Sequence, residues 1–318
     1  MYKIGNVKLK GKVFLAPLAG VNCASFRQLC HEYGAGLVYT QLYHSEGVIS
    51  LHDQKRLKEF LNVNDKERPA SIQLVGNDGE SMGEATKIIS KYADIIDINL
   101  GCPDQAVLAK RAGAFFSKHP EQIPKIVESV VENSKVPVTA KIRTGWDDKE
   151  ITFEKSVKIL NELNVDAIAI HGRTRKQVYE GKANWKYIKK AKEISDVPII
   201  GNGDIFKPGN AKAMIEQTKC DFVMIGRGSM GNPLLFDRAH YLLENGENKE
   251  EPTSEEKKKV FFRFVELYEK VDKNKSFAEF KQHAMWFTKG LENSRRKRDK
   301  ILRMSSFEDI IKYMDACF

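Results

Sequence analysis

The sequence contains few cysteines, and their spacing is not typical of a metal site. Its five cysteines are an odd number and are widely spread, and no two of them form a CxxC motif. The gap between Cys23 and Cys30 is wider than the usual spacing of zinc ligands. The pattern argues against a disulfide framework, a structural zinc and an iron–sulfur cluster, so we expect no metal.

Long apolar runs are also missing. No stretch approaches the roughly 20 apolar residues that a membrane-spanning helix requires. The segment Met1–Asn6 lacks the apolar core of a secretory signal. We therefore expect a cytoplasmic protein without a membrane segment. With 318 residues, 42% of them hydrophobic and 30% charged, the chain can form one large domain and a smaller one.

Positive charge exceeds negative charge, and the formal net charge is +9. Such a balance favours a polyanionic partner only weakly, because many cytoplasmic proteins are basic without binding nucleic acid. The location of the charge along the chain is therefore more informative than its sum.

Short β-rich runs alternate with amphipathic stretches through the first three quarters of the chain. Most of the runs are continuously apolar, as expected for parallel strands that are covered on both faces. Between them, segments such as Gln122–Asn133 and Phe153–Leu163 place apolar residues three and four apart, as helices do. This alternation predicts an α/β fold, a (β/α)8 TIM barrel. The expected strands are Val13–Ala16, Leu37–Tyr39, Ala70–Leu74, Ile95–Asn99, Pro137–Ile142, Ala167–His171, Pro198–Gly201 and Phe222–Ile225.

Polar or turn residues lie at or just past the carboxyl ends of these strands. A barrel gathers the carboxyl ends of its strands on one face, where such enzymes keep their active sites. Each residue alone would be weak evidence, but their convergence predicts a site. They are Pro17, Gln73, Asn99, Lys141, His171, Asn202 and Arg227.

Glycine-rich segments follow the last two expected strands, at Gly201–Ile205 and Gly226–Pro233. Glycine lets backbone N–H groups approach an anion, and barrels often bind phosphate after these two strands. Lys141 in the barrel mouth needs a negative partner. Flavin mononucleotide (FMN) would supply both a phosphate and an acceptor for Lys141. A sugar phosphate would satisfy the glycine-rich loops alone.

The segment Asn99–Pro103 places a thiol, Cys102, directly after a buried strand and a glycine. An isolated cysteine is more often a packing residue than a reactive one. Its position on the expected active face makes a chemical role the better interpretation.

These motifs together resemble the tRNA-dihydrouridine synthases. The similarity runs in the same order from Leu15 to Phe236 and continues more weakly through Lys281–Gly290. It is carried by Ala16–Gly20, Asn99–Pro103, Lys141–Arg143, Ile170–Arg175, Tyr179–Trp185, Asn202–Asp204, Gly226–Gly228 and Gly231–Pro233.

The resemblance implies an FMN-dependent reduction of the C5–C6 double bond of uridine in tRNA, with NADPH or NADH as the external reductant. Hydride would pass from reduced FMN to C6, and Cys102 would donate a proton to C5. A thiol near its normal pKa is protonated at neutral pH and suits this role. Asn99 would orient either the flavin or the base. By motif, the flavin would contact Pro17, Leu18, Ala19, Gln73, Asn99, Lys141, His171, Asn202, Gly203, Asp204, Gly226 and Arg227.

One position departs from the family pattern. The family usually has a glycine where this chain has Arg111. Because arginine adopts a positive φ less easily than glycine, we expect the turn after the cysteine motif to differ locally.

The last part of the chain is expected to form a second domain that binds RNA. The polar segment Glu244–Thr253 is a plausible linker between a catalytic domain at 1–243 and a helical domain at 254–318. Helices are predicted at Ser254–Tyr268, Ser276–Lys289, Arg295–Met304 and Ser306–Ala316, with N-caps at Ser254, Ser276 and Ser306. The expected RNA contacts are Arg173, Arg175, Lys281, Arg295, Arg296 and Arg298.

Two other functions remain open. An FMN-dependent dehydrogenase of the dihydroorotate or dihydropyrimidine type would act on a free base with similar chemistry, but it does not need a basic helical tail. A barrel without flavin could bind RNA and leave Cys102 structural. We expect a monomer, and the sequence does not indicate which uridine would be reduced.

Overall fold

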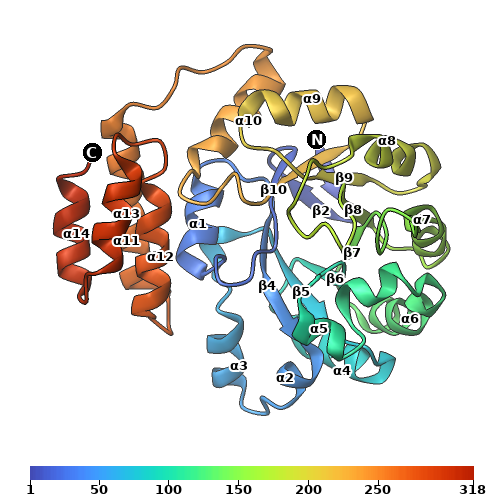
Figure 1. The fold of residues 1–318 in the computed structure, drawn as a ribbon. Helices are drawn as coiled ribbons and strands as arrows, with labels where there is room; N and C mark the ends of the chain where they lie inside the picture. Colours follow the sequence, from blue (N-terminus) through green and yellow to red (C-terminus); the bar gives the residue numbers. More distant parts are fainter.

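The computed structural model describes residues 1–318, and its centre is a closed barrel of eight parallel strands (Figure 1). The strands follow the order β3-β10-β9-β8-β7-β6-β5-β4, and the Leu15 N–H donates to the Leu37 carbonyl at 3.0 Å to close the ring. All eight strands expected from the sequence are confirmed. They are β3 (Val13–Leu15), β4 (Val38–His44), β5 (Ala70–Val75), β6 (Ile95–Leu100), β7 (Val138–Arg143), β8 (Ala167–His171), β9 (Ile199–Asn202) and β10 (Phe222–Ile225).

Alternate residues of each strand point to opposite sides of the barrel wall. In β6, Ile95 packs in the barrel interior, whereas Ile96 and Ile98 belong to the core beneath the helices. A short antiparallel hairpin, β1 (Tyr2–Ile4) and β2 (Val7–Leu9), precedes the barrel. Its residues Ile4 and Leu9 pack with the interior side chains. This hairpin was not among the elements predicted from the sequence.

Helices surround the strands and form the outer layer of the barrel (Figure 1). They are α1 (Ala24–Glu32), α2 (Ser45–Ile49), α3 (Gln54–Leu61), α4 (Gly79–Ile89), α5 (Gln105–Ala109), α6 (Ile123–Asn133), α7 (Phe153–Glu162), α8 (Trp185–Ile194), α9 (Pro208–Thr218) and α10 (Leu234–Asn245). Short 3-10 helices lie at η1 (Asp65–Glu67), η2 (Gly113–Ser117) and η3 (Pro120–Gln122). No helix of the chain combines the length and the apolar character that crossing a membrane requires.

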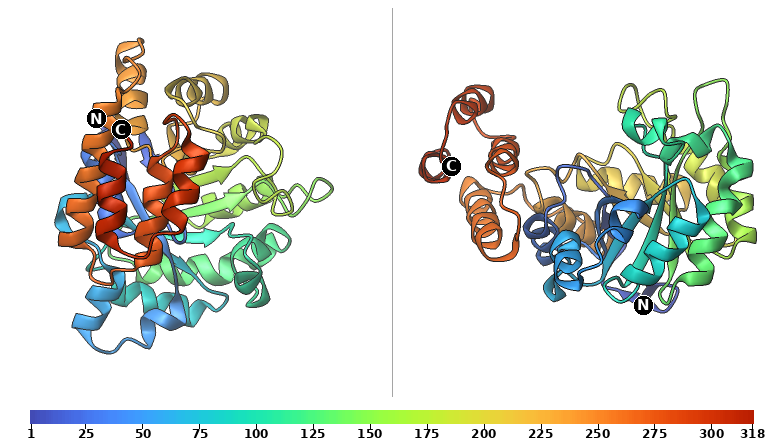
Figure 2. Two further views of the ribbon diagram at one scale, coloured as in Figure 1. Left: turned by 60° about the vertical axis from the view of Figure 1, so that its left-hand side comes forward. Right: turned by 90° about the horizontal axis from the view of Figure 1, so that it is seen from below.

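The tail forms a bundle of four helices beside α1, on one side of the barrel (Figures 1 and 2). They are α11 (Ser254–Val271), α12 (Phe277–Phe287), α13 (Ser294–Leu302) and α14 (Phe307–Asp315). The N-caps predicted at Ser276 and Ser306 are confirmed, but the N-cap of α11 is Thr253 rather than Ser254. Thr253 forms a capping box with Glu256, so the helix begins one residue earlier than a cap at Ser254 would allow.

Helix α10 continues to Asn245 and ends at Gly246, which has a φ of +79°. The segment between the barrel and the bundle is therefore shorter than the predicted linker.

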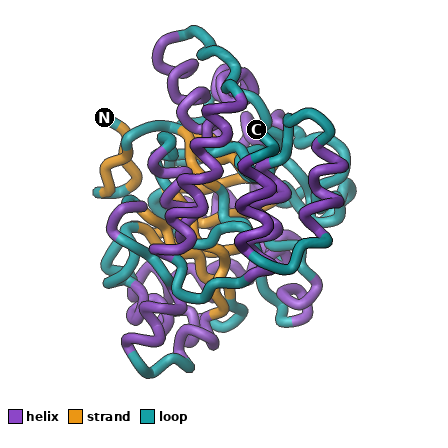
Figure 3. Tube along the Cα trace, turned by 90° about the vertical axis from the view of Figure 1, so that its left-hand side faces the viewer, coloured by secondary structure: helices purple, strands orange, loops and turns teal.

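Figure 3 shows the bundle facing the viewer, in front of the barrel. Contacts of α11 and of its C-cap residue Asp272 fix the bundle on the barrel. The carboxylate of Asp272 accepts hydrogen bonds from the N–H groups of Ala24 and Ser25 at 3.0 and 3.1 Å, and so caps α1 from outside. Arg263 of α11 forms two hydrogen bonds with Glu32 at the other end of α1. The bundle therefore holds α1 at both of its ends.

Candidate active site

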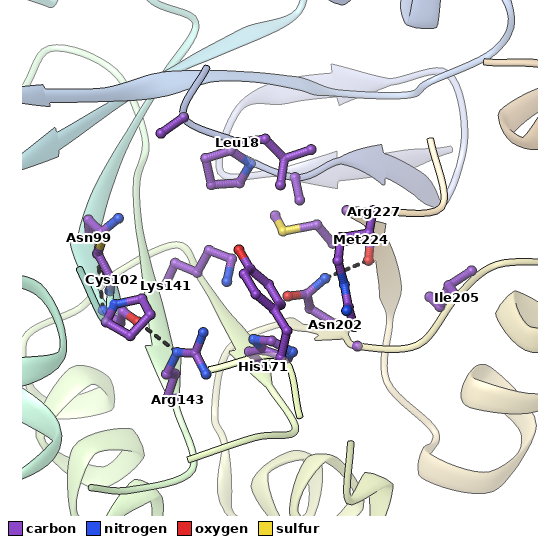
Figure 4. A pocket seen from close by; sticks show the side chains of 18 of the residues that line it. Leu18, Asn99, Cys102, Lys141, Arg143, His171, Asn202, Ile205, Met224 and Arg227 are labelled. Atoms are coloured by element: carbon purple, nitrogen blue, oxygen red, sulfur yellow. Dashed lines mark hydrogen bonds between the residues drawn. The ribbon is translucent and has the colours of Figure 1, made fainter. Parts of the chain in front are cut away.

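A pocket opens at the carboxyl ends of the barrel strands (Figure 4). It spans about 910 Å³ when the open space at its mouth is included. Cys102 and every residue that the sequence suggested for flavin contact line it. In Figure 4, Asn99 and Cys102 lie at one end of the pocket, and Asn202 and Arg227 at the other. The structure thus brings these residues together, while their individual roles stay predictions.

Two segments at the Arg227 end, Gly203–Ile205 and Gly226–Gly228, are called the anion loops below. None of their backbone N–H groups donates a hydrogen bond within the protein. Glycine is required here: Gly203 has a φ of +125°, and a Cβ on Gly228 would overlap the Ile205 carbonyl oxygen. A Cβ on Gly226 would instead meet Ala16 and Leu18 at ordinary van der Waals distance. Unpaired N–H groups around open space are suited to binding an anion.

The carboxylate of Asp204 does not face such an anion, because protein donors already occupy it. Both oxygens accept from Arg173 Nη2 at 2.8 Å, and one accepts from the Ala183 N–H at 2.7 Å. Arg227 Nη2 lies 3.3 Å from the other oxygen. Asp204 therefore holds the arginines and its loop in place, and only its backbone N–H is free for a ligand.

Arg173 was expected to contact RNA, and its environment does not allow this. The residue is 2% exposed and bonds to Asp204 and to the carbonyls of Glu180 and Gly181. A guanidinium enclosed in this way cannot reach a phosphate on the surface. Arg173 is thus a buried support of the anion loops and not an RNA contact.

Cations dominate the electrostatics of the pocket. Lys141 has no ion-pair partner, and burial, followed by repulsion from Arg143, lowers its pKa to about 8. Burial and the same cations hold the pKa of His171 well below its usual range, so this imidazole is neutral. Since Arg173 Nη1 can only donate, His171 Nε2 at 3.4 Å is the acceptor, and the proton lies on Nδ1. The pocket is therefore prepared for a ligand with negative charge.

The loop that carries Cys102 is fixed by Asn99. Asn99 Oδ1 accepts from the N–H groups of Gly101 and Cys102 at 3.1 and 2.8 Å. Burial raises the pKa of the Cys102 thiol, which therefore stays protonated at neutral pH. Beyond the loop, Arg111 adopts a φ of +54°. Arginine thus adopts the left-handed conformation at this position despite its cost, and the expected local difference of the turn stays a prediction.

Several residues that line the pocket were not predicted from the sequence. Arg143 lines the pocket beside Cys102 and donates from Nε to the Gly101 carbonyl at 2.8 Å. Tyr179 and Phe206 both pack against the Arg227 guanidinium, with ring centres 4.6 and 5.5 Å from it. Arg143 could have been found, because it lies two residues after Lys141 on the same side of a strand. The two aromatic residues lie in loops, where no periodicity reveals them.

Asp97 was also missed, and it lies below the pocket with an exposure of 0%. Gln73 Nε2 and Thr139 Oγ1 each donate to it at 2.6 Å. Burial raises its pKa to about 6. An acidic residue in an apolar strand, two residues before Asn99, was the available signal.

The remaining basic residues expected to contact RNA differ in their surroundings. Arg175 stacks on Trp146 at 4.5 Å, and Lys281 donates to the Leu302 carbonyl at 3.2 Å. The other three lie on α13 and are Arg295, Arg296 and Arg298. The ion pairs of the tail are formed by lysine and arginine residues of α11 and do not include these three.

Arg298 belongs to a series of cations that leads toward the pocket. Burial lowers the pKa of Lys289, and the positive charges of Arg298 and Arg227 lower it further. Lys289 in turn donates to the Met230 carbonyl at 3.3 Å and so lies against the barrel. Arg296 lies toward Tyr313 instead. Arg227, Lys289 and Arg298 form what we call the cationic track.

Comparison with known sequences adds an independent line of evidence. The profile of the Dihydrouridine synthase (Dus) family matches residues 14–316. The tRNA-dihydrouridine synthase B of Pasteurella multocida is 36% identical over 292 residues, which cover 91% of this chain and 87% of that protein. The corresponding enzyme of Vibrio vulnificus is 36% identical over 294 residues, covering 92% and 91%.

Solved structures with a similar fold have much lower identity. The structure of TcOYE with pHBA superposes with a TM-score of 0.60 at 13% identity, over 85% of this chain and 97% of that chain. The old yellow enzyme homologue from Zymomonas mobilis gives a TM-score of 0.53 at 12% identity, over 79% and 93%. These similarities support the barrel fold.

Proposed function

The chain belongs to the dihydrouridine synthase family, and from this premise we infer that it is a flavin enzyme that reduces uridines in tRNA to dihydrouridine. The relatives are named for this reaction on tRNA, and they align over nearly the whole chain, tail included. We propose FMN as the flavin and NADPH or NADH as the reductant. Because tRNA is the substrate, we also propose a cytoplasmic protein.

The single observation that supports FMN best is the set of unpaired backbone N–H groups in the anion loops. They fit a phosphate, and Arg227 beside them adds a guanidinium. Lys141, which forms no ion pair in the protein, would hold the ring system at the other end of the pocket. When bound, the flavin supplies the electron pair that reduces the C5–C6 double bond of uridine.

The protein side of the reaction is a proton transfer from Cys102. Its thiol keeps a proton at neutral pH because burial raises its pKa. We propose that Sγ delivers this proton to C5 of the base, on the face opposite the flavin. Asn99 holds the loop so that the thiol lies at the pocket wall. Arg143, tied to the Gly101 carbonyl, keeps a positive charge next to the thiol.

The partner we propose for the tail is the body of the tRNA. A base must leave its stack to enter the pocket, which costs a few kcal/mol. Phosphate contacts elsewhere have to offset this cost. A groove between barrel and bundle adjoins the pocket, and both are lined by Leu18, Tyr179 and Arg227. The other wall of the groove is formed by Trp286 and Lys289 of the tail region. The cationic track follows the same side.

A direct test separates this function from the two alternatives. The purified protein should bind FMN and, with NADPH, form dihydrouridine in unmodified tRNA but leave free uracil and orotate unreduced. Reduction of the free bases alone would favour the dehydrogenase of free pyrimidines. A protein that binds tRNA but no flavin would instead be a non-catalytic barrel. The expected monomer stays a prediction, which sedimentation would check.

A further inference from the structure

We propose that Asp97 is a positioning residue: it sets the direction of the hydrogen bonds made by Gln73 and Asn99, and through them it seats the loop of Cys102. The part of this inference that concerns proton donation rests on the proposed function, whereas the seating of the loop does not. No contact between Asp97 and a substrate is involved.

The series of hydrogen bonds runs from Asp97 through Gln73 and Asn99 to the loop of Cys102, and it begins at a buried carboxylate. Asp97 is 0% exposed and accepts from Gln73 Nε2 and Thr139 Oγ1, both at 2.6 Å. Lys141 is the cation whose charge acts on it. An ionised carboxylate can only accept hydrogen bonds. Its pKa of about 6 leaves it ionised above neutral pH. Gln73 must therefore turn its NH2 group toward Asp97.

The direction of each later bond follows from the first. With its NH2 group on Asp97, Gln73 presents Oε1 to Asn99, whose Nδ2 donates to it at 2.8 Å. Asn99 Oδ1 is then the atom that faces Gly101 and Cys102, and it accepts from their N–H groups. Gln73 and Asn99 are 1% and 7% exposed, so water cannot substitute freely for these partners.

A side-chain amide has nearly the same shape when its oxygen and its NH2 group exchange places. Packing therefore does not select one orientation, and the free energy of the hydrogen bonds does. Only the partners decide which end is oxygen and which is nitrogen. If Asn99 turned by half a rotation, its NH2 group would face the two N–H groups, and two donors would meet without an acceptor. Asp97 is the one member of the series that cannot turn into a donor while it is ionised.

Asp97→Asn tests this at constant shape, because the new amide can donate to Gln73 and reverse the series. Thr139→Val is the matched control: it removes the other donor to Asp97 and leaves the bonds from Gln73 to Cys102 in place. A third variant, Asp97→Asn with Gln73→Glu, moves the carboxylate from residue 97 to residue 73, the next member of the hydrogen-bond series. It restores an obligatory acceptor for Asn99 Nδ2.

The experiment measures alkylation of Cys102 by iodoacetamide in the flavin-free form of each protein, because Gln73, changed in the double variant, is itself a proposed flavin contact. The Cys102 peptide is quantified by mass spectrometry. We expect Asp97→Asn to accelerate alkylation about tenfold, since releasing the loop forfeits hydrogen bonds of that order. Thr139→Val and the double variant should stay within about twofold of the unchanged protein. The peptide of Cys23, half-buried at the bundle contact, reports any general loosening.

Equal alkylation rates in the unchanged protein and Asp97→Asn would overturn the proposal, as would equal acceleration in Asp97→Asn and Thr139→Val. If Asp97→Asn does not fold, the double variant decides: normal alkylation supports the series, and fast alkylation or failure to fold contradicts it. As a second readout, single-turnover reduction of tRNA should slow in Asp97→Asn with unchanged tRNA affinity. Should Cys102 prove not to be the proton donor, only this second readout would fail.

Discussion

Acid should weaken the contact between bundle and barrel through one histidine, His283 of α12. The side chain is 0% exposed, and its Nε2 donates to the Val21 carbonyl at 3.0 Å. Phe264 and Phe26 lie against the ring at 4.7 and 5.1 Å. Its Nδ1 is buried without a partner. A proton on Nδ1 would therefore have no acceptor, and burial lowers the pKa of His283 to about 3.

The magnitude follows from linkage. In the unfolded chain the pKa of histidine is about 6.5, so below that pH the unfolded state binds a proton that the folded state does not. Stability is therefore complete above about pH 6.5 and is lost as the pH falls toward the folded pKa. At about pH 5 the difference amounts to about 2 kcal/mol. This figure hardly depends on the folded value, since His283 is neutral in the protein at that pH.

Urea unfolding of the unchanged protein and of His283→Gln, at about pH 7.5 and about pH 5, measures this effect. The glutamine can still donate to the Val21 carbonyl, but it does not titrate. Asp97 and Asp272, whose pKa values are raised, contribute slopes of the opposite sign in both proteins and cancel in the comparison. The unchanged protein should lose about 2 kcal/mol more than the variant. Equal losses would refute the reasoning.

Three further outcomes are expected. Lys141→Met removes a buried cation and should stabilise the flavin-free protein near neutral pH by up to about 3 kcal/mol, measured by thermal unfolding. The same variant should bind FMN more weakly in a titration, and an unchanged FMN affinity would contradict the proposed site. Arg298→Gln should reduce the salt slope of tRNA binding by about 1, whereas Arg296→Gln, which lies off the cationic track, should change it less; equal effects would argue against the track. Asp272→Ala should lower the unfolding free energy by about 2 kcal/mol, and an unchanged urea midpoint would exclude its capping role.

The barrel could be predicted because parallel strands buried on both faces leave continuous apolar runs. The polar residues that interrupt these runs at their ends, such as Lys141 and His171, line the pocket for the same reason. The hairpin β1–β2 was missed although the turn Gly5–Asn6 between two short alternating runs is a recognised signal. Its strands have only three residues each, too few for periodicity to stand out.

The parts of the site that could not be predicted depend on partners far apart in the chain. Asp97 is visible in the sequence, but its bonds to Gln73 and Thr139 span 24 and 42 residues. Arg173 and Arg175 looked alike, and only the fold of their loop shows that one is enclosed by Asp204 and the other stacks on Trp146. Loop geometry has no period, so neither distinction was accessible from spacing.

The central claim is that Cys102 protonates uridine in a pocket that binds the flavin independently of the thiol. Single-turnover reduction of unmodified tRNA by the flavin-loaded protein and by Cys102→Ala tests it most directly, with flavin content measured in both. We expect equal flavin content and loss of dihydrouridine formation by about a hundredfold or more in the variant. Dihydrouridine formation at the unchanged rate in Cys102→Ala would contradict the account.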